Sequence, residues 1–124
     1  MGRKVLVIED NADIAHLLQV NLRDIACDVQ VANDGQQGLR MALEQDFDLI
    51  ILDMNLPGNE DVRLLEFIRM NKPAIPIIIF STLTAKDEVK HFKDLGVRDV
   101  ITKPIQKEQV LKMLNKHIRR KKSQ

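Results

Sequence analysis

Residues 47–58, FDLIILDMNLPG, form the stretch that decides the fold. Phe47 and residues 49–52 are apolar, which is typical of a short strand buried on both faces, and such strands belong to parallel sheets covered by helices. The strand brings Asp53 to its carboxyl end, and Pro57-Gly58 then turns the chain. This predicts Asp53 at the sheet edge where open α/β proteins bind ligands, although an aspartate that merely begins a turn fits the stretch equally well.

The length and composition indicate one compact domain over residues 1–124. The single cysteine, Cys27, cannot form an internal disulfide, and the net charge is only +1. There is no secretory signal and no apolar stretch near the roughly 20 residues that span a bilayer, so we expect a cytoplasmic protein without membrane contact. The basic residues at 116–124 are expected to be the solvated end of a helix, and with no Trp or Tyr to stack on bases we expect no direct nucleic-acid binding.

Alternating strand and helix patterns run along the whole chain. Further strands are predicted at residues 4–8, 28–32, 76–80 and 97–102, and helices at residues 12–26, 36–45, 62–71, 84–95 and 106–120. Apolar stripes predict inward faces made of Ile14, Leu17, Leu18, Leu22 and Ile25 in the first helix and of Leu39, Ala42 and Leu43 in the second. Gly96 is expected to end the fourth helix. These units predict an α/β fold, a five-stranded parallel sheet with helices on both faces, whose strand order the periodicity leaves open.

Polar side chains follow four of these strands: Glu9, Asp10, Asp53, Ser81 and Lys103. In a parallel sheet all carboxyl ends lie at one edge, so we expect these residues to converge. Carboxylates held ~4 to 6 Å apart repel by about 1 to 4 kcal/mol per pair, so the cluster requires a cation or a proton. Hard oxygen ligands favour Mg²⁺. Zinc is disfavoured because His16, His91 and His117 lie at no ligand spacing and are expected on helix surfaces.

A carboxylate beside a bound cation can attack a phosphoryl group and become an acyl phosphate, which gives Asp53 a chemical role. The ion and the Lys103 ammonium would neutralise charge on the phosphoryl oxygens during transfer. The Ser81 hydroxyl can donate a hydrogen bond to such an oxygen only after the group has arrived. A difference of this kind between two states is what a switch requires.

The pattern Glu9-Asp10, Asp53, Ser81 and Lys103-Pro104 resembles the receiver domain of two-component response regulators, across essentially the whole chain. The resemblance implies a flavodoxin-like fold with strand order 2-1-3-4-5 and a sensor histidine kinase or phosphotransfer protein as the donor. It also implies that the backbone carbonyl of Asn55 joins Glu9, Asp10 and Asp53 around Mg²⁺, and that the Lys103-Pro104 peptide is cis. The resemblance further implies that an output domain or partner meets the face formed by the fourth helix, fifth strand and fifth helix.

The sequence departs from the family's usual pattern at three places, one of them a pair of residues. Glu60-Asp61 stand where an Asp-Gly pair is common, and Thr82 follows Ser81 where Ala or Gly is common. Val100 occupies the position of an aromatic switch residue, and a valine with one stiff χ1 cannot swing as a ring does. We therefore expect the loop at residues 82–87 and the fourth helix to carry the outward change, with Val100 packed in the core.

The leading interpretation is a phosphoacceptor signalling domain that catalyses only its own phosphotransfer and dephosphorylation. Two alternatives remain open from the residues. One is a Mg²⁺-dependent phosphohydrolase that acts on small substrates through an aspartyl phosphate, against which stand the short loops and the lack of a cap insertion. The other is a receiver that has lost its chemistry and only docks, against which stand the intact site residues.

Overall fold

The strands and helices alternate along the chain in a computed structural model that describes residues 3–24, 27–53, 60–81, 93–94, 96–102 and 107–117. The elements are β1 (Arg3–Ile8), α1 (Ala12–Arg23), β2 (Cys27–Ala32), α2 (Gly35–Glu44), β3 (Leu49–Asp53), α3 (Glu60–Asn71), β4 (Ile77–Ser81), β5 (Asp99–Thr102) and α5 (Lys107–His117). Most of the predicted helix at residues 84–95 lies outside the described residues. None of the described helices is long and apolar enough to cross a membrane.

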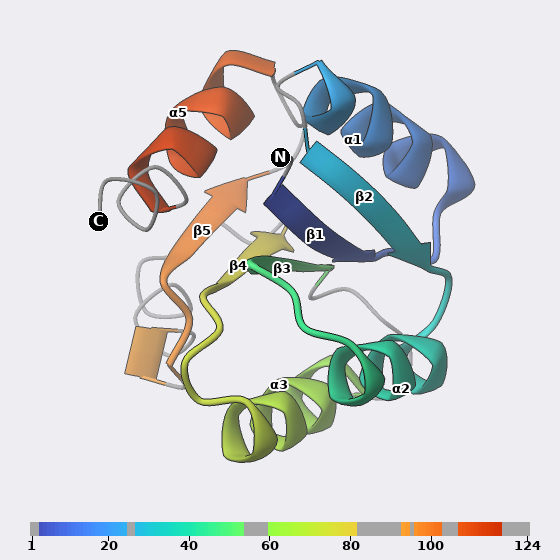
Figure 1. Ribbon diagram of the computed structural model, residues 1–124, viewed down its shortest axis with the longest axis vertical. Helices are drawn as coiled ribbons and strands as arrows, with labels where there is room; N and C mark the ends of the chain where they lie inside the picture. Colours follow the sequence, from blue (N-terminus) through green and yellow to red (C-terminus); the bar gives the residue numbers. More distant parts are fainter. Residues whose placement is uncertain are drawn as a thin grey trace.

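The sheet has five strands in the order β2-β1-β3-β4-β5, and every neighbouring pair is parallel. This confirms the predicted flavodoxin-like arrangement. Helices α1 and α5 cover one face of the sheet, and α2 and α3 cover the other (Figure 1). Ile8 of β1 lies opposite Leu52 of β3, and Asp53 lies opposite Phe80 of β4, so these strands end at nearly the same level.

Each inner strand is buried on both faces because its alternate side chains enter two separate apolar clusters. Ile8 and Leu52 belong to the cluster that also contains Leu64 and Leu65 of α3. The neighbouring residues of the same strands enter the cluster on the opposite face, below α1 and α5; Val7 is an example. The continuous apolar runs of β1, β3 and β4 follow directly from this two-sided burial.

Several details differ from the predicted pattern. Leu17 and Leu43 were assigned to inward faces, but their side chains are 45% and 40% exposed. The contact face of α2 is made of Gly35, Gly38 and Ala42, because small residues let the helix backbone approach the sheet, which leaves Leu43 at the side. The prediction for Leu17 is wrong for a similar reason, since α1 turns Ala15, Leu18 and Leu22 inward.

The fifth strand is also shorter than predicted. It begins at Asp99 and not at residue 97, although Val97 ahead of it is buried. Gly96 adopts φ +96°, and its N–H donates to the Lys93 carbonyl at 3.0 Å, in agreement with its predicted role in ending a helix. A left-handed conformation of this kind is open to glycine at little steric cost.

Gly38 is the point of closest approach between α2 and β1. A Cβ atom added at this position would lie 2.6 Å from Cδ1 and 2.8 Å from Cγ1 of Ile8, whose side chain is fully buried. Ile8 therefore cannot move into solvent to make room. The position requires glycine because of packing against the strand that carries the site.

We expect Gly38→Ala to lower the free energy of unfolding by about 1–2 kcal/mol, because overpacking costs more than the helix propensity gained from alanine. Urea unfolding measures the change, and Glu44→Ala on the exposed side of α2 is the control. In the Gly38→Ala/Ile8→Val double variant, which lacks the nearest methyl group, the combined loss should be smaller than the sum of the single losses. Stabilisation by Gly38→Ala alone would contradict this packing.

Candidate functional site

Three carboxylates meet at the carboxyl edge of the sheet. Asp53 is the last residue of β3, and Glu9 and Asp10 directly follow β1, its neighbour in the sheet. One oxygen from each of Glu9, Asp10 and Asp53 lies within 4.8 Å of the others. Glu9 and Asp53 are only 1% and 2% exposed, whereas Asp10 is exposed. The structure thus brings together all three acids that the sequence pattern placed in one site.

Asn11 organises the β1 side of this cluster, although it is not among the predicted site residues. Its side-chain Oδ1 accepts hydrogen bonds from the N–H groups of Asp13 and Ile14 at 2.9 and 3.1 Å, which caps the amino end of α1. Its own N–H donates to Oε2 of Glu9 at 3.2 Å. Asn directly before a helical stripe is a cap signal, so this residue could have been found from the sequence.

The geometry favours a bound divalent cation. Like charges at these separations repel, and the repulsion is strongest where two of the groups are shielded from water, as Glu9 and Asp53 are. Carboxylate oxygens are hard ligands of the kind that Mg²⁺ and Ca²⁺ prefer, and the exposed Asp10 leaves one side of the cluster open to solvent. The donor set therefore fits a partly hydrated hard cation.

Of the remaining predicted site residues, the structure describes only Ser81 and Val100. Ser81 is the last residue of β4, so its backbone lies at the same edge as Asp53, in the adjacent strand. Lys103, Pro104, Asn55 and Thr82 lie outside the described residues. Val100 is half-buried in β5 and packs against the cluster below α2 and α3, which agrees with the predicted core position.

The described histidine and the cysteine, two side chains that could bind a metal or react, lie outside the carboxylate cluster. His16 is exposed on α1, as predicted; His91 lies outside the described residues, as does the side chain of His117. Cys27 begins β2 at the opposite edge of the sheet. Burial raises the pKa of its thiol, an effect that Arg3 partly offsets and Asp48 reinforces, and this favours the protonated thiol over the thiolate at neutral pH.

Comparison with protein families gives a match over most of the chain. The family model described as response regulator receiver domain matches residues 5–115. Among curated proteins, the cell cycle response regulator CtrA of Brucella ovis is 29% identical over 119 residues, which are 96% of this chain and 51% of CtrA. The chain therefore spans about half the length of the curated relatives it matches.

Solved structures with the same fold include two receiver domains. The receiver domain of the Francisella response regulator 1452 is 27% identical, with a TM-score of 0.90 over 97% of this chain and 99% of that chain. The receiver domain of the sensor histidine kinase PA1611 from Pseudomonas aeruginosa is 26% identical, with a TM-score of 0.85 over 95% of this chain and 98% of that chain. In that structure a magnesium ion is coordinated in the active site cleft.

We expect Mg²⁺ to raise the melting temperature of this protein, because a ligand of the folded state stabilises it by about 1.4 kcal/mol at ten times its Kd. Asp10→Asn should melt at a higher temperature than the wild type without Mg²⁺, since one repulsion is removed, and should lose most of the Mg²⁺-dependent rise. Differential scanning fluorimetry at low ionic strength measures both effects. Asp13→Asn, exposed in the first turn of α1 and outside the cluster, is the control; an equal loss in that variant would assign the effect to general charge screening.

Proposed function

We propose that this chain takes a phosphoryl group onto Asp53, and the premise is its family: the chain belongs to the receiver domains of response regulators. We take residues 1–124 as one such domain. Its donor would be a sensor histidine kinase or a histidine phosphotransfer protein. The observation that carries the proposal is the position of Asp53, 2% exposed at the end of β3 and beside two further carboxylates.

In the proposed reaction an Oδ atom of Asp53 attacks the phosphorus atom of a phosphohistidine. An O–P bond forms, the N–P bond breaks, and the histidine nitrogen leaves with the electron pair of that bond. Asp53 suits this attack because its backbone is held in the sheet between β1 and β4, which fixes the direction of the carboxylate. A Mg²⁺ ion held by Glu9, Asp10, Asp53 and the Asn55 carbonyl would supply positive charge for the phosphoryl oxygens.

Other residues of the chain would act on the phosphoryl group once it is in place. Lys103 would bring an ammonium group to its oxygens, and Ser81 would donate a hydrogen bond to one of them. The position of Ser81 supports this role, since it ends the strand next to the one that carries Asp53. The resulting change would reach a partner or output domain at the face made by the fourth helix, β5 and α5.

A phosphohydrolase acting on small substrates is the competing proposal. It needs a site that encloses its substrate, and in the described residues the connections at this edge are short: residues 9–11 join β1 to α1, and residues 33–34 join β2 to α2. The signalling role therefore has the better support. Hydrolysis in this protein would be limited to the aspartyl phosphate itself.

The deciding experiment incubates the protein with acetyl phosphate and Mg²⁺ and weighs it by intact mass spectrometry. We expect one added phosphoryl group on the wild type and none on Asp53→Asn, because the amide is not a nucleophile toward phosphorus. Asp13→Asn should be modified as the wild type is. A phosphorylated Asp53→Asn variant would move the acceptor to another residue, and repeated turnover of p-nitrophenyl phosphate would favour the phosphohydrolase.

A second expectation concerns the route of the signal. Val100 packs against the core cluster below α2 and α3, so we expect it to keep its rotamer when the acceptor is modified. Crystal structures with and without beryllofluoride, which mimics the phosphoryl group on Asp53, would compare the two states. We expect the Ser81 hydroxyl to move and the backbone of residues 82–87 to shift. A full rotamer change at Val100 with that backbone unmoved would contradict this route.

A further inference from the structure

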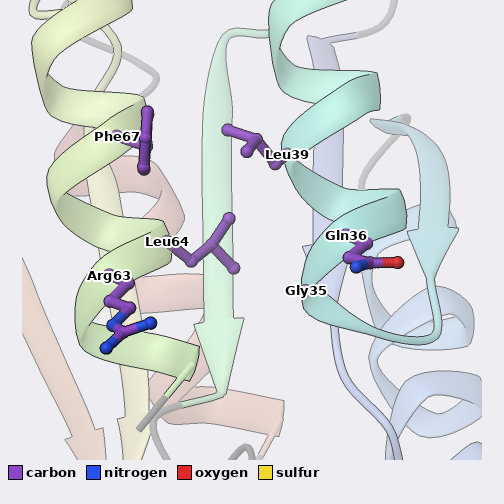
Figure 2. Close-up of a pocket in the computed structure, with 6 residues that line it drawn as sticks. All are labelled: Gly35, Gln36, Leu39, Arg63, Leu64 and Phe67. Atoms are coloured by element: carbon purple, nitrogen blue, oxygen red, sulfur yellow. The ribbon is translucent and has the colours of Figure 1, made fainter.

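A groove runs between α2 and α3 on the face of the sheet away from α1 and α5 (Figure 1). Its volume is about 320 Å³, and its lining consists of Gly35, Gln36 and Leu39 from α2 with Arg63, Leu64 and Phe67 from α3. Figure 2 shows Leu39 and Leu64 projecting between the two helices, in front of the green strand β3. The groove is thus an apolar channel with polar side chains at one end.

Apolar side chains continue beyond the groove in both helices. Phe67 is 53% exposed although it lines the groove, and Met70, three residues later in α3, is 79% exposed. Leu43 lies one turn after Leu39 in α2 and is 40% exposed. Single exposed apolar residues are common on protein surfaces, but here three of them lie on the two helices that border one groove, and they add to the apolar surface available to a partner.

Two arginines lie at the rim of the groove. Arg63 lines the groove directly, and Arg40 is exposed one turn after the lining residue Gln36. In the described part of the chain neither guanidinium makes a hydrogen bond or an ion pair. Among the side chains of α2 and α3 that the structure describes, the exposed acids Glu44 and Glu66 lie further round each helix from the groove than the two arginines do.

We propose that this groove binds an acidic amphipathic helix of a partner protein. Apolar side chains spaced i, i+3, i+4 and i+7 would fill the channel, and carboxylates beside them would pair with Arg40 and Arg63. The helices α2 and α3 have 10 and 12 residues, so a partner helix of about three turns would match their length. The surface is separate from the proposed phosphoryl site and from the face assigned to the output.

Charge also decides against the other occupants. In a symmetric dimer through this groove the same patch would meet itself, and Arg40 and Arg63 would face like charges. The chain's own basic residues at 116–122 have the same sign as the rim. An anionic membrane would attract arginines, but such surfaces typically present about 4 to 8 basic residues, more than this rim does.

The test uses unphosphorylated protein, so its result does not depend on the proposed phosphorylation. The probe is a synthetic helical peptide of about 12 residues with leucines at the stated spacing and glutamates beside them. A matched peptide carries lysines in place of the glutamates. Amide chemical shifts of the labelled protein, followed by NMR during titration, report both the affinity and the residues affected.

We expect the acidic peptide to shift residues of α2 and α3 and the basic peptide to bind at least about tenfold more weakly. Arg63→Glu should weaken the acidic peptide about tenfold and partly rescue the basic one, and Phe67→Ala should weaken both by a similar factor. Leu17→Ala, at an exposed leucine of α1, is the matched apolar control and should change affinity less than about twofold. Because Arg63 is exposed, Arg63→Glu should leave the melting temperature unchanged. This variant therefore still tests the proposal if Phe67→Ala lowers the melting temperature.

Several results would overturn the proposal. These are equal binding of the two peptides, shifts centred on α1, and no binding of the acidic peptide at millimolar concentration. A dimer in analytical ultracentrifugation that Phe67→Ala dissociates would assign the groove to a second copy. Phe67-dependent sedimentation with phosphatidylserine vesicles, in the absence of peptide binding, would assign it to a lipid surface.

Discussion

The constraint on which the rest of the structure depends is the parallel pairing of β1 with β3. Ile8 lies opposite Leu52, so the next residues of both strands, Glu9 and Asp53, reach the edge of the sheet side by side. Two carboxylates that are free in water stay apart because their charges repel and each is well hydrated, yet Glu9 and Asp53 lie close together and are almost fully buried. Hydrophobic burial of the two strands therefore holds the two carboxylates close together, an arrangement that a bound cation would favour.

The fold was predictable because its strongest signals are local. The apolar runs of β1, β3 and β4 are buried on both faces, and the acids that end β1 and β3 meet because parallel strands end at one edge. What the pattern missed depends on tertiary packing. Leu43 follows the helical period of α2, but close contact between Gly38 and Ile8 rotates the buried face toward the glycines. The cap at Asn11 was readable, whereas its bond to Glu9 follows only from the three-dimensional course of the turn.

A single arginine near the end of α3 holds the chain where it enters β4 and β5. The Arg69 guanidinium, near the end of α3, donates to the carbonyls of Pro73, Ile75 and Gly96. Burial lowers the pKa of the Arg69 guanidinium, and the positive charge of nearby Arg98 lowers it further. The three carbonyls replace hydrogen bonds to water that the guanidinium loses on burial. Arg69 thereby ties α3 to the segment that leads into β4 and to the segment that leads into β5.

The groove and the carboxylate cluster rest on the same packed layer. Ile8 and Leu52 directly precede Glu9 and Asp53, and their side chains lie in the cluster that supports α2 and α3. Close-packed protein interiors transmit small displacements because they have few voids to absorb them. A partner helix bound between α2 and α3 would act on Ile8 and Leu52 through the packed cluster. A phosphoryl group on Asp53 would act on the same two residues from the edge of the sheet. If either event changes the affinity for the other, thermodynamic linkage requires the reverse effect to be of equal size.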